Sequence, residues 1–194
     1  MKGPLGRFVL KVLGWLPVAF AVWYVTSPVL LWPARVVVEL TARVGFADLV
    51  RGIEQNGATL TFVTTLKPGS AGAASGLLTV DVDMLLYSFG LPLFAALVLA
   101  ASEPGWLRRL GIGYAALVPF IAWGVLADFL KSVAITSAPL VASQTGFVAW
   151  QREAIAFAYQ FGTLILPTVV PAVAWVLTHR AFLERLRPPP RVMG

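Results

Sequence analysis

The fold class follows from an uncharged stretch near the middle of the chain, Leu110-Gly-Ile-Gly-Tyr-Ala-Ala-Leu-Val-Pro-Phe-Ile-Ala-Trp-Gly-Val-Leu-Ala127. A helix rises about 1.5 Å per residue, so a stretch of this length can cross a hydrocarbon core about 30 Å thick. Three further apolar stretches are equally free of charge: residues 12–34, 84–102 and 154–179. The sequence therefore predicts an all-α integral membrane protein with a four-helix transmembrane bundle.

The composition also indicates a membrane protein. Hydrophobic residues make up 58% of the 194 residues and charged residues only 12%, whereas a soluble domain carries about 25% charged residues. The chain has no cysteine, which excludes disulfides, cysteine nucleophiles and cysteine-ligated metals. Four spans leave no room for a large extramembrane enzyme domain, so we expect a single membrane domain over residues 1–194.

Charge placement selects four spans, at about residues 10–32, 84–102, 108–130 and 154–178. A fifth uncharged stretch, residues 132–151, is rich in polar side chains and is interpreted as a surface or re-entrant connection. Short cytoplasmic segments collect Lys and Arg, and a fifth span would move the basic C-terminal tail outside. With four spans, both termini are cytoplasmic and the inner segments hold most basic residues: Lys2, Arg7, Lys11, Arg108, Arg109, Arg180, Arg185, Arg187 and Arg191.

Residues 35–83 form the one sizeable insert between spans, which we expect outside the cytoplasm. Arg35, Glu39 and Arg43 follow each other at i,i+4 spacing, which predicts an amphipathic helix. The β-branched segment 59–66 and the alternating segment 76–83 predict a β-hairpin, with a loose Gly- and Ser-rich tip over residues 67–75. Two strands alone are marginally stable, so the hairpin is expected either to pack on the bundle as a cap or to receive a partner's strand.

Few polar side chains occur near the spans, and they define the candidate partner-binding residues. Asp128 and Lys131 are three residues apart at the outer end of the third span, where an ion pair or a docking role is open. Arg152 and Glu153 open the fourth span, and a guanidinium binds carboxylates well. Gln160 lies inside that span and is expected to turn inward toward a neighbouring helix.

Several chemistries are excluded or unsupported by the sequence. His179, the one histidine, is expected to reach the inner membrane boundary, so a catalytic triad or a two-histidine metal site cannot form within one chain. No phosphate-binding loop or nucleic-acid surface is apparent. We therefore predict no catalytic residues, no cofactor and no metal, and a protein that is not an enzyme.

Five short motifs are distributed along the chain: Trp15-Leu-Pro17, Trp23-Tyr24, Leu86-Tyr-Ser-Phe-Gly-Leu-Pro-Leu93, Ala122-Trp-Gly-Val-Leu-Ala-Asp-Phe-Leu-Lys131 and Trp150-Gln-Arg-Glu-Ala-Ile-Ala156. With these motifs the chain resembles the exosortase H-associated membrane protein family over nearly its whole length. The resemblance implies a small inner-membrane accessory to an exosortase, a membrane-embedded cysteine transpeptidase that processes proteins with a C-terminal sorting helix. The lack of cysteine means that this chain is not the transpeptidase.

Together these observations predict a non-catalytic protein of the bacterial inner membrane that binds or positions a membrane partner at the extracytoplasmic face. The expected partner is an exosortase-type transpeptidase or its sorted substrate, beside the lipid bilayer itself. Two alternatives stay open: a small transporter or channel built around the proline-kinked spans, and a structural subunit of a larger membrane complex.

Overall fold

A computed structural model describes residues 4–68 and 76–186, so most of the predicted hairpin tip lies outside the described residues. The N-terminal part contains α1 (Pro4–Leu30), α2 (Trp32–Gly45), β1 (Val50–Asn56), β2 (Thr59–Thr64) and β3 (Thr79–Asp83). The remainder is helical and contains α3 (Leu85–Ser88), α4 (Gly90–Ala101), α5 (Trp106–Lys131), η1 (Ser132–Thr136), α6 (Pro139–Gln144), α7 (Ala149–Gln160), η2 (Phe161–Ile165), α8 (Leu166–Thr178) and α9 (Arg180–Leu186).

Three helices in the described part of the chain are long and apolar enough to cross a membrane: Leu5–Leu30, Trp106–Thr136 and Ala149–Thr178. The second predicted span corresponds to α3 and α4, which together form the shorter apolar helix Leu85–Ala101. The structure thus supports three of the four predicted membrane helices, and the count of four stays a prediction. The connection at residues 132–151 is mostly helical, because η1 continues α5 and α6 follows it.

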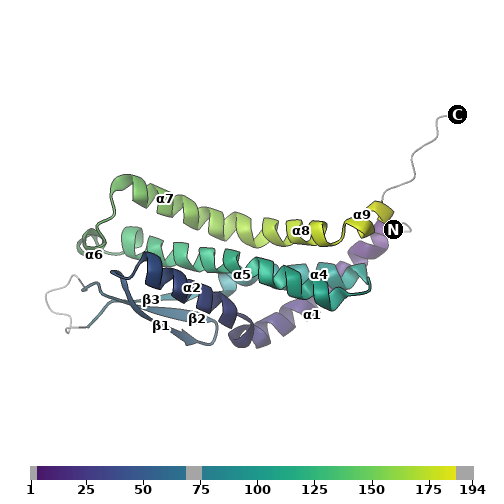
Figure 1. Cartoon of the computed structure of the whole chain (residues 1–194), viewed down its shortest axis with the longest axis horizontal. Helices are drawn as coiled ribbons and strands as arrows, with labels where there is room; N and C mark the ends of the chain where they lie inside the picture. Colours follow the sequence, from purple (N-terminus) through teal and green to yellow (C-terminus); the bar gives the residue numbers. More distant parts are fainter. Residues whose placement is uncertain (1–3, 69–75, 187–194) are drawn as a thin grey trace.

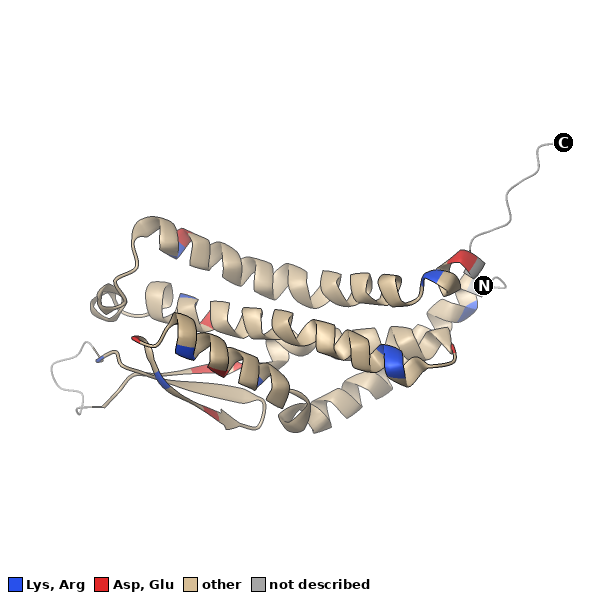
Figure 2. Cartoon of the chain, in the orientation of Figure 1, with Lys and Arg blue, Asp and Glu red and all other residues tan. Residues whose placement is uncertain are grey.

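The helices lie roughly along the long axis of the molecule (Figure 1). The beginning of α1, the loop between α4 and α5, and α9 lie at one end, whereas the sheet, α6 and the beginning of α7 lie at the other. Charged residues gather toward these two ends, and long helical stretches between them carry none (Figure 2). This separation is what a body that crosses a bilayer requires, because charges inside hydrocarbon are costly.

The predicted β-hairpin is confirmed as β2 and β3, which pair in antiparallel register from Thr59↔Asp83 to Val63↔Thr79. A further strand, β1, pairs with the other edge of β2, so the described residues contain a three-stranded sheet in the order β1-β2-β3. The turn between β1 and β2 follows Asn56, with Gly57 at a φ of 63°. Glycine adopts this left-handed conformation without steric cost.

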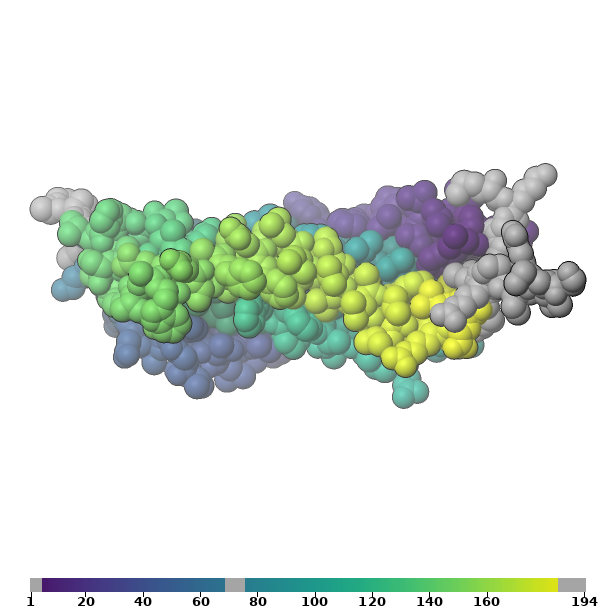
Figure 3. Space-filling view, turned by 90° about the horizontal axis from the view of Figure 1, so that it is seen from above, coloured from purple at the N-terminus to yellow at the C-terminus, as the bar shows by residue number. Residues whose placement is uncertain are grey.

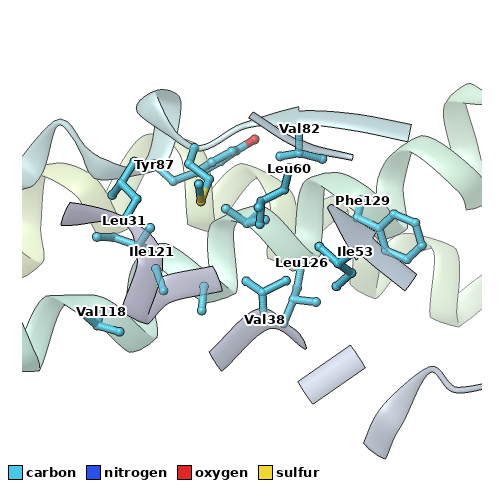
Figure 4. Close-up of a cluster of buried hydrophobic side chains, with 14 of the residues drawn as sticks. Leu31, Val38, Ile53, Leu60, Val82, Tyr87, Val118, Ile121, Leu126 and Phe129 are labelled. Carbon is cyan, nitrogen blue, oxygen red and sulfur yellow. The ribbon is translucent and has the colours of Figure 1, made fainter. Parts of the chain in front are cut away.

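One face of the sheet is covered by α2 and α5, which gives the hairpin the second surface it needs. Leu60 and Phe62 of β2 and Val82 of β3 belong to the same buried cluster as Val38 of α2 and Phe129 of α5. Figure 4 shows Leu60, Val82, Val38 and Phe129 in this cluster. The rings of Phe62 and Phe129 stack with centroids 4.3 Å apart. The sheet is therefore a cap fixed on the helices, as in the first of the two expectations for the hairpin.

The other end of the molecule is held by aromatic packing. Phe8 of α1 stacks on Trp175 of α8 with ring centroids 5.4 Å apart, and Trp175 stacks on His179 at 5.5 Å. His179 is only 1% exposed. The expectation that His179 reaches outward to the membrane boundary is therefore wrong, because its ring packs inward against Trp175.

Candidate partner-binding site

Asp128 and Lys131 form an ion pair near the end of α5. The Asp128 Oδ1 and Lys131 Nζ atoms are 2.8 Å apart, and the two side chains are 14% and 25% exposed. Lys131 Nζ also lies 3.9 Å from the centre of the Tyr159 ring on α7, within the range of a cation–π contact. The pair therefore joins α5 to α7, and both charges are already engaged within the chain.

Tyr87 of α3 adds a polar atom beside this pair. Its hydroxyl is buried without a hydrogen bond, and Asp128, Thr163 and Tyr159 are polar side chains in its surroundings. Tyr87 was not among the predicted site residues, although it belongs to the Leu86–Leu93 motif. No charged residue neighbours Tyr87 within its apolar helix, so the sequence gives no sign of a polar site there. Its position beside Asp128 depends on how the helices pack.

Close packing of η2 and α3 against α5 places Tyr87 beside the ion pair. A Cβ on Gly162 of η2 would lie 3.1 Å from the Cα of Gly124, and a Cβ on Gly124 would lie 2.3 Å from the Tyr87 ring. Small residues allow such approach between membrane helices. The π-helical turn η2 precedes Pro167, whose missing N–H disturbs the regular helical ladder.

Arg152 and Glu153 lie on the first turn of α7, beside a groove of about 540 Å³. The start of α7 is fixed because the Val148 N–H donates to Gln151 Oε1 at 3.0 Å, and Gly146 turns the chain with a φ of 69°. The groove lies between α7 on one side and η1 and α6 on the other, and is lined by Ala134, Ile135, Ser137, Pro139, Ala142, Ser143, Arg152, Glu153 and Ala156.

The electrostatic feature of this groove is the Arg152 guanidinium. Its Nε atom is buried without a hydrogen bond, and the ion pairs found among the described residues do not include Arg152. An unpaired buried donor next to a positive charge favours an acidic ligand group. Arg152 does not pair with Asp128, because Asp128 is held by Lys131.

The α6 wall of the groove is tied to the insert that carries the sheet. Gln144 receives the Lys67 N–H on its Oε1 atom at 3.0 Å and donates from Nε2 to the Lys67 carbonyl at 3.0 Å. These two bonds form a clamp between the sheet end and α6. Both walls of the groove are therefore held in place, α6 by its hydrogen bonds to Lys67 and the start of α7 by the bond between Val148 and Gln151.

The structure thus divides the five predicted site residues into three groups. Asp128 and Lys131 form one pair, and Arg152 and Glu153 line the groove nearby. Gln160 is exposed on α7, so the expectation that it turns inward is wrong. No group of three or more metal-ligating side chains occurs among residues 4–68 and 76–186.

These features define a class of protein, a helical membrane protein whose small β-sheet packs against one end of its helices. The chain belongs to the exosortase H-associated membrane protein family, because the family model matches residues 2–182. The resemblance found in the sequence is thereby confirmed. Comparisons with curated proteins and with solved structures found no significant match.

Proposed function

We propose that this protein is a non-catalytic accessory that binds a membrane partner at the end formed by the sheet, α6 and α7. The partner is an exosortase-type transpeptidase or the substrate that it sorts, in agreement with the family description. The observation that supports the proposal most strongly is the unpaired Arg152 guanidinium beside the groove. A carboxylate from the partner would complete the electrostatics of this site.

The groove suits an acidic group on a peptide. A guanidinium can bind a carboxylate with two parallel hydrogen bonds, and the surrounding Ala134, Ala142 and Ala156 offer apolar contact. Glu153 stands beside Arg152 and repels a second acidic group. The two neighbouring charges would therefore fix the orientation of the partner as well as attract it.

In this proposal the groove faces the extracytoplasmic side of the bacterial inner membrane and both termini are cytoplasmic. The support comes from charge placement in the sequence, because nine of the fifteen Lys and Arg residues fall in the three segments that we predict to be cytoplasmic, before the first span, between the second and third, and after the fourth. The positive-inside rule assigns such segments to the cytoplasm.

The proposal is tested by charge reversal at Arg152. We expect Arg152→Glu to reduce co-purification of the tagged exosortase-type partner by about tenfold or more, because breaking a buried charge pair costs about 2–5 kcal/mol, and to slow substrate processing. The matched control is Arg51→Glu, at an exposed position on β1 of the same end, which should leave both unchanged. Equal co-purification and processing in the two variants would refute the role of the groove.

The same purification distinguishes the alternatives. A stoichiometric complex with proteins unrelated to sorting would favour a structural subunit. The transporter alternative would place the polar Gln160 inside the bundle, and Gln160 is instead exposed on α7.

A further inference from the structure

A second groove lies between α1, α4 and the first half of α5. It has a volume of about 460 Å³, within the range of about 300–1,000 Å³ that is typical of small-ligand sites. Representative residues of its wall are Trp15 and Val22 of α1, Ala95 and Leu99 of α4, and Gly111 and Tyr114 of α5. The α1 and α5 positions belong to helices long enough to cross a membrane, and the α4 positions belong to the shorter apolar helix Leu85–Ala101. We therefore place the groove at the depth of the hydrocarbon.

The two hydroxyl groups on the wall of this groove are satisfied within the chain, whereas the Nε1 atom of Trp23, another polar group of the wall, is buried without a hydrogen bond. The Tyr114 hydroxyl donates to the Leu30 carbonyl at 2.6 Å, and the Thr26 hydroxyl donates to the Val22 carbonyl at 2.7 Å. A buried water needs about two to four polar partners, so a space with so few free polar groups does not hold water well. Its surface therefore matches a hydrocarbon chain.

Gly111 keeps part of the groove open. A Cβ placed on Gly111 would meet no atom within 4 Å, whereas a Cβ on Gly113, two residues later, would collide with the Phe94 ring at 2.0 Å. Gly113 therefore serves helix packing, and Gly111 does not. The missing side chain at Gly111 leaves room in the groove instead.

A positive charge marks one end of the groove. Lys11 lies one helical turn before Trp15 on the same face of α1, and its Nζ atom is 3.2 Å from the Ser102 hydroxyl. Ser102 follows Leu99 of the groove wall by three residues and ends α4. An ammonium group and a hydroxyl thus lie together where the apolar wall ends, at the same end of the molecule as the start of α1 (Figure 1).

We infer that this groove binds an anionic phospholipid, with one acyl chain along the apolar wall and the phosphate at Lys11 and Ser102. The charge complements a phosphate, and the apolar wall complements an acyl chain. This lipid site lies on a different set of helices from the Arg152 groove and is independent of the proposed function.

The inference is tested by native mass spectrometry of the full chain with phosphatidylglycerol and phosphatidylcholine of identical acyl chains. We expect the unaltered protein to retain one phosphatidylglycerol about fivefold more strongly than phosphatidylcholine, from a contribution of about 1 kcal/mol per basic residue near the headgroup. Lys11→Gln should remove this preference. Its control, Arg108→Gln, changes an exposed arginine that lines a different recess and should keep the preference.

Gly111→Phe should fill the groove without a backbone clash and abolish retention of both lipids. Gly14→Phe is the matched control, because Gly14 is also on an apolar helix with open space and is not part of the wall. Retention by Gly111→Phe equal to that of the unaltered protein would overturn the inference. The inference would also be overturned if the unaltered protein were a dimer and Gly111→Phe a monomer, because a second copy of the chain would then occupy the groove.

Discussion

The Asp128–Lys131 pair is expected to stabilise the junction of α5 and α7. Asp128→Asn should lower the free energy of unfolding by about 1.5–3 kcal/mol, because it removes a charge-assisted hydrogen bond from a mostly buried lysine. Thermal unfolding in mild detergent measures this loss. Adding Lys131→Met should restore most of it, since an apolar replacement of a buried pair is often neutral.

The exposed Glu39–Arg43 pair of α2 is the control for this experiment. Its atoms are 2.5 Å apart, but the Arg43 side chain is 73% exposed. Glu39→Gln should therefore change stability by no more than about 0.5 kcal/mol. A loss as large as that of Asp128→Asn would show that burial does not determine the strength of these pairs.

His179 is expected to make stability depend on pH. Burial lowers the pKa of His179 below its ordinary value of 6.5, and the positive charge of Arg109 acts in the same direction. The Nδ1 atom lies 3.1 Å from the Trp175 carbonyl and donates to it, while Nε2 is buried without a hydrogen bond. The neutral ring is thus the form that fits the fold.

The sign follows from this lowered pKa. The unfolded chain takes up a proton as pH falls through about 6.5, whereas the folded chain does so only at lower pH, so stability is complete above that pH and decreases below it. We expect the temperature at the midpoint of thermal unfolding to be lower at pH 5.5 than at pH 7.5. His179→Phe, which keeps a ring beside Trp175, should reduce this decrease; an unchanged pH profile would exclude His179 as its source.

Among the elements, the contact of α5 with α3 and η2 depends on glycine. Gly124→Ala should destabilise the protein by about 1–3 kcal/mol, because the new Cβ would lie 2.3 Å from the Tyr87 ring. Gly14→Ala is the control, with no atom within 4 Å of its Cβ, and should be neutral or stabilising by up to about 1 kcal/mol. Thermal unfolding of the two variants checks the difference; equal midpoints would contradict the close contact.

Strand β1 shows where pattern reading failed at the level of elements. The β2–β3 hairpin was predictable, because Leu78, Val80 and Val82 alternate with polar residues. In β1 the register shifts between Val50 and Gly52, so the apolar residues do not keep a period of two. Asn56-Gly57 was the available signal, since Asn-Gly is a preferred hairpin turn.

The candidate site was also only partly predictable. Asp128 and Lys131 could be paired from their spacing, since residues three apart share a helix face. The groove beside Arg152 could not be foreseen, because it depends on how η1 and α6 return toward α7. Gln160 was assigned to the wrong side because an uncharged apolar helix gives little information on which face meets its neighbours.

At the scale of the whole molecule, hydropathy and charge predicted the helical membrane architecture more reliably than they predicted strand β1 or the groove beside Arg152. The chain forms an elongated body in which α7 and α8 run along one face (Figure 3). Long uncharged stretches predict such helices directly, because backbone in lipid must be hydrogen-bonded within the helix. The second apolar helix, Leu85–Ala101, covers the predicted apolar stretch 84–102 to within one residue at each end, so here the length of the stretch also predicted the length of the helix.

The orientation of this body in the membrane is best measured by cysteine labelling, since the chain has no native cysteine. Asn56→Cys and Pro104→Cys place single thiols at exposed positions in the β1–β2 turn and in the α4–α5 loop. With a membrane-impermeant maleimide, Asn56→Cys should react in intact spheroplasts and Pro104→Cys only after the membrane is disrupted. Labelling of Pro104→Cys in intact spheroplasts, with Asn56→Cys protected, would place the Arg152 groove in the cytoplasm and contradict the proposed docking to an extracytoplasmic partner.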